Sequence, residues 1–130
     1  MNEIKITILS KPVLINPVIG ALNGICEELS LDEDTRWSLE ISLREALANA
    51  IIHGNKGETE KKVFIEFKWG KREFLITIED EGKGFSPKKE EPSPSLETSG
   101  RGLMIIKSKM DSVEYKKGAN GFQLILKKKI

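Results

Sequence analysis

Two segments with alternating apolar side chains, joined by a short connection, place the tightest limit on the fold. In residues 62–69 and 73–80, apolar side chains recur at every second position. A period of two is typical of a strand that buries one face. Gly70 and Lys71 stand between the two segments and fit a tight turn, so we predict a β-hairpin.

The rest of the chain supplies further strands and helices. Alternating apolar residues predict strands at 4–8, from 113–115 onward, and at 122–126. Apolar residues at helical spacing predict three helices. The first covers 13–29, the second begins at 32–34 and ends at Gly54 and Gly57, and the third covers 102–110. Hairpin strands combined with helices favour an α/β (α+β) two-layer sandwich, with a mixed, mostly antiparallel sheet and helices on one face.

Composition limits the classes of function. The chain has 130 residues, which suits a single domain spanning 1–130. Its formal net charge is +1, from 21 basic and 20 acidic residues, so no electrostatic attraction to nucleic acid is expected. No apolar run approaches the roughly 18 residues of a membrane-spanning helix, and no leader peptide is recognisable. We therefore expect a cytoplasmic protein that binds neither nucleic acid nor membrane.

Residues 81–99 differ from the rest, since they combine mixed charge with clusters of glycine and proline. Such a composition predicts a mobile loop. Periodic structure resumes directly afterwards, so we expect the segment to belong to the domain and not to link two domains.

The first candidate site is a carboxylate and an amide on the second predicted helix. Glu45 and Asn49 are four residues apart, which places them on one helix face, and their neighbours are apolar. Buried polar groups of this kind need partners. An amide oxygen suits Mg²⁺, and a carboxylate can act as general base on a hydroxyl or a water. An exposed polar helix face is the alternative.

The second candidate site follows the predicted hairpin, where Asp80 is followed by glycines at 82 and 84. Asp80 continues the buried row of its strand, so its carboxylate needs a hydrogen-bond donor, and the exocyclic amine of adenine would be one. Gly82 and Gly84 allow the backbone to turn and to approach a flat ligand closely. An acidic turn at the end of a strand is the alternative.

The third candidate site is Ser99-Gly100-Arg101-Gly102-Leu103, which is predicted to open the last helix. Backbone N–H groups at a helix N-terminus attract anions, and glycines let a phosphate come near. Arg101 could pair with phosphate oxygens. A glycine cap beside a surface arginine is the alternative.

His53 and Cys26 favour structural interpretations. His53 is the only histidine, and no cysteine lies near it in sequence to complete a metal site, so we expect it to cap or pack a helix end. Cys26 is the only cysteine and lies among apolar residues, so we expect it to be a small buried side chain.

Taken in order, Glu45-x-x-x-Asn49, Asp80-x-Gly82-x-Gly84 and Gly100-x-Gly102 resemble the N, G1 and G2 boxes of the GHKL ATPase superfamily, which has the Bergerat ATP-binding fold. The stretch Glu-Ala-Leu-Ala-Asn-Ala-Ile-Ile-His-Gly at 45–54 is similar to that of bacterial anti-sigma factor serine/threonine kinases of partner-switching systems, as is 99–103 followed by Met110-Asp111. The resemblance covers nearly the whole chain.

The resemblance implies that the cofactors are ATP and Mg²⁺. Asn49 would coordinate the Mg²⁺ that bridges the phosphates, and Asp80 would hold the adenine amine. Glu45 would accept the proton of a substrate serine. Residues 86–99 would form an ATP lid. The remaining nucleotide contacts would come from Gly82, Gly84, Phe85, Ser99, Gly100, Arg101, Gly102 and Leu103.

The implied function is a protein serine kinase that phosphorylates an anti-anti-sigma partner and, in alternation, holds a sigma factor inactive. Relatives commonly dimerise, so a homodimer is expected by analogy. Two alternatives remain open. The chain could be a non-catalytic switch that binds nucleotide to choose between protein partners, or a slow ATPase in which Glu45 activates water.

Two features depart from the family. Relatives often carry a threonine on the final strand near the adenine aspartate, where this chain has Phe122, Gln123 and Ile125, so we expect a different hydrogen-bond network around adenine. The predicted lid also contains prolines, which we expect to stiffen it. They are Pro87, Pro92 and Pro94.

Overall fold

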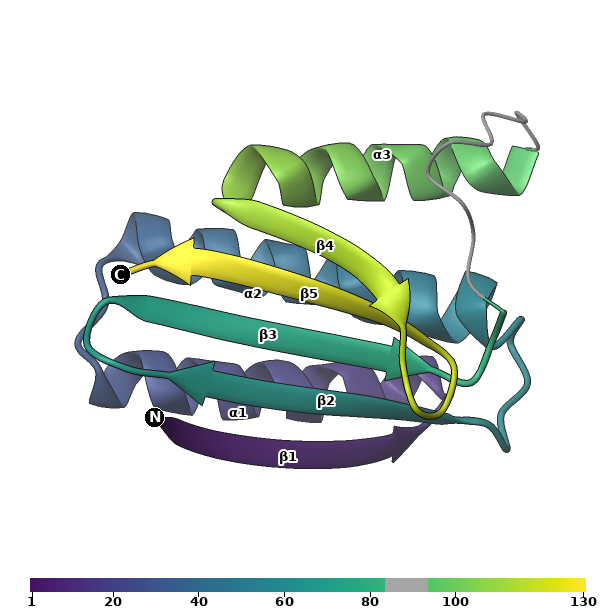
Figure 1. Cartoon of the computed structure of the whole chain (residues 1–130), viewed down its shortest axis with the longest axis horizontal. Helices are drawn as coiled ribbons and strands as arrows, with labels where there is room; N and C mark the ends of the chain where they lie inside the picture. Colours follow the sequence, from purple (N-terminus) through teal and green to yellow (C-terminus); the bar gives the residue numbers. More distant parts are fainter. Residues whose placement is uncertain (84–93) are drawn as a thin grey trace.

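An antiparallel sheet forms one layer of the structure. The structure is a computed structural model that describes residues 1–83 and 94–130, with the backbone alone for 94–101. Within these residues five strands pair in the order β1-β2-β3-β5-β4 (Figure 1). They are β1 (Asn2–Leu9), β2 (Lys62–Trp69), β3 (Glu73–Asp80), β4 (Ser112–Lys117) and β5 (Phe122–Lys129). The expectation of a mixed sheet was wrong, because each described pair is antiparallel.

Helices cover one face of this sheet and leave the other face open, so the predicted two-layer sandwich is confirmed (Figure 1). α1 and α2 lie behind the sheet, and α3 lies beside α2, next to β4. The helical segments are a 3₁₀ turn at Pro12–Leu14, α1 (Ile15–Glu28), α2 (Glu33–Ala48), a π-helical segment η2 (Asn49–Gly54) and α3 (Pro94–Lys109). In the described part of the chain, every helix is too short or too polar to cross a membrane.

The core lies where the buried rows of the sheet meet the apolar faces of the helices. Phe67 and Phe74 are fully buried and pack edge to face, with ring centroids 6.2 Å apart. Leu22 of α1 and Leu43 of α2 are also fully buried. Cys26 belongs to this core, as expected from the sequence. The two hairpin strands were predicted with the bounds that the structure gives them.

The start of α2 is fixed by a local cap. The Thr35 backbone N–H donates to the Asp32 carboxylate at 2.7 Å, which satisfies a donor that the first helical turn would otherwise leave free. This hydrogen bond lowers the pKa of Asp32. Glu33 and Asp34 follow in the first turn, where negative charge is favoured by the helix dipole.

The prediction for α3 was wrong at its N-terminus. The helix begins at Pro94 and not near Gly102, so Gly100 and Gly102 lie inside it. Proline is tolerated in the first helical turn, and a glycine inside a helix costs only about 1 kcal/mol. Gly100 and Gly102 therefore do not stand at a helix N-terminus, and their contacts with phosphate remain a prediction. The last residues of the expected loop, 94–99, are helical, and the other part of the expected lid, 86–93, lies outside the described residues.

Candidate functional site

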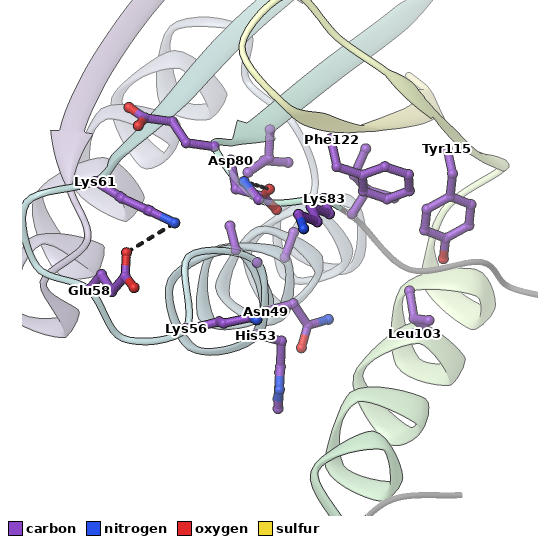
Figure 2. Close-up of a pocket in the computed structure, with 17 residues that line it drawn as sticks. Asn49, His53, Lys56, Glu58, Lys61, Asp80, Lys83, Leu103, Tyr115 and Phe122 are labelled. Atoms are coloured by element: carbon purple, nitrogen blue, oxygen red, sulfur yellow. Dashed lines mark hydrogen bonds and ion pairs between the residues drawn. The ribbon is translucent and has the colours of Figure 1, made fainter. Parts of the chain in front are cut away.

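A cavity of about 570 Å³ opens between the C-terminal end of β3, the π-helical segment and α3 (Figure 2). Its size is within the usual range for small-molecule sites. The lining combines apolar and aromatic side chains with three carboxylates, one amide and three lysines. The lining residues are Ala46, Asn49, Ala50, His53, Gly54, Lys56, Glu58, Lys61, Ile78, Asp80, Glu81, Gly82, Lys83, Leu103, Tyr115, Phe122 and Leu124.

Asp80 supplies a carboxylate at the inner end of this cavity. It is the last residue of β3 and is only 8% exposed. The Gly82 backbone N–H donates to its Oδ1 at 2.8 Å. Burial raises the pKa of Asp80, and the backbone N–H groups of Gly82 and Phe122 partly oppose that rise. A hydrogen-bond donor from a ligand would stabilise the ionised form.

Two glycines let the backbone close around Asp80. A Cβ on Gly54 would collide with the Asp80 carboxylate, and a Cβ on Gly82 would collide with the carbonyl oxygen of Gly54. The end of η2 therefore packs directly against the turn that follows β3. Gly84 and Phe85, which were also predicted to shape this pocket, lie outside the described residues.

Glu45 and Asn49 approach α3 from the neighbouring helix. Glu45 lies in the last turn of α2, and Asn49 begins η2. A Cβ built on the buried Gly102 would lie 2.9 Å from Oε2 of Glu45 and 3.3 Å from Nδ2 of Asn49. Gly102 thus allows α3 to pass close to both polar groups. Asn49 and Leu103 line the cavity, whereas Glu45 does not line it and approaches Gly102 together with Asn49.

The helix that carries Asn49 changes from α to π at that residue. The Asn55 backbone N–H donates to the Ala50 carbonyl oxygen at 2.8 Å, five residues back. A π turn is wider than an α turn and is often found at functional sites. In this segment it places Asn49 and His53 on the same cavity (Figure 2). His53 is near a helix end, as expected, but its role as a lining residue was missed.

Lysines around the cavity were also missed by the sequence analysis. Lys56, Lys61 and Lys83 all line it, and Lys61 forms an ion pair with Glu58 at 3.0 Å (Figure 2). Lys56 precedes Gly57 and Lys83 follows Gly82, and these positions were the available signal for two of the three lysines. Three carboxylates line the same cavity, but Glu58 pairs with Lys61 and Glu81 accepts from a backbone N–H, so Lys56 and Lys83 are the lysines that can attract an anionic ligand.

An aromatic wall faces the cavity on the β4–β5 side. Tyr115 and Phe122 stack with ring centroids 6.0 Å apart, and burial raises the pKa of Tyr115 to about 12. Phe122 pairs with Asp80 in the β3–β5 register, so the two side chains share a face. Gln123 points to the open face of the sheet and donates to Glu79 at 3.0 Å. Of the residues expected to replace the family threonine, Phe122 is the one that reaches the cavity.

The residues present fit a magnesium nucleotide. A flat base can pack on aromatic and apolar side chains while its amine donates to a buried carboxylate. Phosphates suit the cationic rim, and the Asn49 amide oxygen is a hard ligand of the kind that Mg²⁺ prefers. Asn49, Asp80 and Gly82 border one cavity, and Gly102 contacts Asn49 beside it. The side chains of Ser99 and Arg101, and any contact of Gly100, are outside what the structure describes.

Comparisons with known proteins agree with this arrangement. Residues 8–128 match the family described as the histidine kinase-like ATPase domain. An anti-sigma F factor of Clostridium perfringens (strain SM101 / Type A) is 33% identical over 143 residues, an alignment that covers 99% of this chain and 97% of that relative. An anti-sigma F factor of Oceanobacillus iheyensis is 44% identical over 91 residues, covering 65% of this chain and 61% of that relative.

Solved structures share the fold. The RsbU and RsbW domains of Rv1364c from Mycobacterium tuberculosis superpose with a TM-score of 0.69 and 14% identity, covering 98% of this chain and 32% of that longer chain. A histidine kinase domain from Erythrobacter litoralis EL346 superposes with a TM-score of 0.57 and 14% identity, covering 89% of this chain and 59% of that chain. At this identity the likeness concerns the fold alone.

Proposed function

The chain belongs to the histidine kinase-like ATPase family, and from this premise we propose that it is an anti-sigma factor with protein serine kinase activity. It would bind ATP with Mg²⁺, phosphorylate a serine of an anti-anti-sigma partner, and hold a sigma factor inactive in alternation. The observation that carries the proposal is that Asn49 and Asp80 line one cavity, while the Glu45 carboxylate lies with the Asn49 amide close to Gly102 of α3.

Nucleotide binding would divide between the two ends of the cavity. Asp80 would accept a hydrogen bond from the adenine amine, and Phe122 would pack against the base from the neighbouring strand. Asn49 would hold Mg²⁺ together with phosphate oxygens, which neutralises charge on the phosphates. Lys56 and Lys83 are placed on the rim where they can attract the same anion.

Glu45 would act as the general base. Its carboxylate lies beside Asn49, at the point where α3 passes closest. It would accept the proton of the substrate serine as the serine oxygen bonds to the γ-phosphorus and the bond from that phosphorus to the bridging oxygen of ADP breaks. The products would be phosphoserine and ADP.

A transfer assay tests this activity. The chain would be incubated with ATP, Mg²⁺ and a small anti-anti-sigma protein encoded beside it, and phosphate on serine would be followed. Glu45→Gln should lower transfer about 100-fold or more, since a positioned base contributes that much. Glu40→Gln is the matched control, because Glu40 lies on the same helix but contacts Asn23 and Arg44 instead of the cavity.

The outcomes separate the candidate functions. Phosphoserine that depends on Glu45 supports the kinase. Tight ATP binding without transfer or turnover would leave a nucleotide-dependent switch, and phosphate release without a protein acceptor would indicate a slow ATPase. Equal transfer by the two glutamine variants would contradict the role of Glu45.

A homodimer remains part of the proposal. β1 is an edge strand of the described sheet, with Ile4 40% and Leu9 37% exposed, so it offers unpaired backbone groups and apolar side chains to a second copy. Sedimentation of the purified chain measures its mass. A monomer at all accessible concentrations would remove this part of the proposal.

A further inference from the structure

A buried amide outside the expected nucleotide contacts connects several elements at the cavity end of the sheet. Asn55 is 0% exposed and follows directly after η2. Its Nδ2 donates to Oγ of Ser10 at 2.6 Å and to the carbonyl oxygen of Lys62 at 2.9 Å, and its Oδ1 accepts from the Glu81 backbone N–H at 2.8 Å. The amide therefore uses both donor hydrogens and its carbonyl oxygen, a combination that an aspartate or leucine of similar size cannot supply.

The hydrogen bond to Glu81 reaches the turn that carries the base-binding carboxylate. Glu81 lies between Asp80 and Gly82, and Gly54 precedes Asn55 and packs against both of these residues. The hydrogen bond from the Glu81 N–H to the Asn55 side chain thus connects the end of η2 to the Asp80 turn, next to the contact between Gly54 and Gly82. Because η2 begins with the magnesium-ligand candidate, the same bond relates the two ends of the cavity.

The other two hydrogen bonds connect Asn55 to the end of β1 and to the start of β2, two strands whose residues do not line the cavity. The Ser10 backbone N–H, just after β1, donates to the Lys61 carbonyl oxygen at 2.8 Å. The Lys62 backbone N–H, at the start of β2, donates to the Glu81 carboxylate at 3.0 Å. Asn55, Glu81 and Lys62 consequently form a closed set of hydrogen bonds, and moving the Asp80 turn would break more than one of them.

We propose that Asn55 is a positioning residue for nucleotide binding. It sets the separation between the Asp80 turn and the helix that carries Asn49, so that the base and the phosphates of one ligand are held together. This inference rests on the proposed function, and it adds a residue that touches neither base nor phosphate. We call the hydrogen bonds of the Asn55 side chain the Asn55 clamp. Without this clamp, the turn and the helix would still form, but the distance between them would no longer fit the distance between the base and the phosphates of one nucleotide.

The test measures ADP affinity in the presence of Mg²⁺ by calorimetry, at a temperature where denaturation shows each variant to be folded. Asn55→Ala should weaken ADP binding between about tenfold and 100-fold, because a displaced Asp80 carboxylate would lose its hydrogen bond to the base, and a hydrogen bond to a charged group contributes that much. Gln123→Ala is the matched control. It removes a side-chain hydrogen bond to the buried Glu79 at the same end of the sheet, but on the open face, so its ADP affinity should equal that of the unmodified chain.

A double-mutant cycle separates positioning from a general loss of stability. If Asn55 acts through the Asp80 turn, Asn55→Ala should cost much less affinity in the Asp80→Asn background than in the unmodified chain. Should Asn55→Ala fail to fold, Ser10→Ala removes one bond of the same clamp, and the same cycle then applies with a smaller loss. Additive losses would overturn the inference.

The result also distinguishes this inference from the proposed function. If the unmodified chain does not bind ADP or ATP, the proposed function fails. If it binds ADP and Asn55→Ala and Ser10→Ala bind equally well, the proposed function stands and the positioning role of Asn55 is wrong.

Discussion

Glu79 and Asp80 are adjacent in the chain, yet they face opposite sides of the sheet and have different surroundings. Both are buried, with exposed fractions of 5% for Glu79 and 8% for Asp80. On the open face, Glu79 accepts from the Asn120 backbone N–H at 2.6 Å and from Gln123 at 3.0 Å, and so holds the turn between β4 and β5. On the helical face, Asp80 borders the cavity of about 570 Å³.

The comparison shows that burial of a carboxylate does not by itself mark a ligand site. The Glu79 carboxylate is matched by donors from its own chain and stabilises a turn. Glu79 also lines a cavity, of about 330 Å³, but its carboxylate already accepts from Asn120 and Gln123. Asp80 borders the cavity of about 570 Å³ that Asn49 shares, so a ligand can supply a further donor there. Four predictions test this difference between the helical face and the open face of the sheet.

The first prediction concerns the glycine that packs on each carboxylate. A Cβ on Gly54 would collide with Asp80, and a Cβ on Gly118 would collide with Glu79. Gly54→Ala and Gly118→Ala should each lower the free energy of unfolding by about 1–3 kcal/mol through overpacking. Gly54→Ala should in addition weaken ADP binding by about 100-fold or more. Calorimetry and urea denaturation measure both quantities, and equal ADP affinity in the two variants would break the comparison.

The second prediction exchanges each carboxylate for an amide. Asp80→Asn should weaken ADP binding about tenfold to 100-fold, since a hydrogen bond to a charged acceptor is lost, with little loss of stability because a buried charge is also removed. Glu79→Gln should do the reverse, because the amide keeps one acceptor oxygen and its NH₂ would face the other of the two donors, the Asn120 N–H or the Gln123 amide. Glu79→Gln should lose stability and keep its ADP affinity. A loss of affinity in Glu79→Gln alone would contradict the assignment of the site to the helical face.

The third prediction follows from the raised pKa of Asp80. Burial makes the folded chain bind the Asp80 proton more tightly than the unfolded chain does, so this group should lower the free energy of unfolding as pH rises through its folded pKa. Ionisation supplies the stronger acceptor, so ADP affinity should increase over the same window, which lies above the ordinary value of 3.8. Across this window, titration calorimetry should show the rise in ADP affinity and urea denaturation the fall in the free energy of unfolding of the unmodified chain. In Asp80→Asn, the pH dependence of both quantities should be reduced to the part that the other titratable groups contribute.

The fourth prediction concerns the rim. Lys61 lines the cavity and pairs with Glu58, whereas Lys127 pairs with Glu73 at 3.1 Å and does not line it. Lys61→Gln should weaken ATP binding about threefold, as expected for a partly exposed charge, and the effect should shrink at high salt. Lys127→Gln should leave ATP binding unchanged. Equal small losses in both variants would mean that net charge, and not the rim, attracts the ligand.

Much of the sheet could be predicted because its signals are local. The strands at 62–69 and 73–80 follow from a period of two, and the same alternation places Asp80 on the buried face. That alternation also indicates that Gln123 and Phe122 point to opposite faces, which the sequence analysis did not use. The grouping of Glu45 with Asn49 likewise follows from helical spacing alone.

Other features depend on contacts between distant segments. The π turn after Ala48 cannot be predicted from the spacing of apolar residues. The helix packs there against the turn after β3, which is distant in sequence. The start of α3 was missed because glycines normally interrupt helices, while here Gly102 serves the close approach of two helices. The Asn55 clamp joins residues 10, 55, 62 and 81, and a single sequence gives no sign that these segments meet.

A crystal structure of the chain with ADP and Mg²⁺ would show whether one nucleotide occupies this cavity. We expect the adenine amine within hydrogen-bond distance of the Asp80 carboxylate, the ring against Phe122, and Mg²⁺ held by the Asn49 amide oxygen together with the phosphates. Nucleotide bound on the open face beside Glu79, or a base placed away from Asp80, would contradict this expectation.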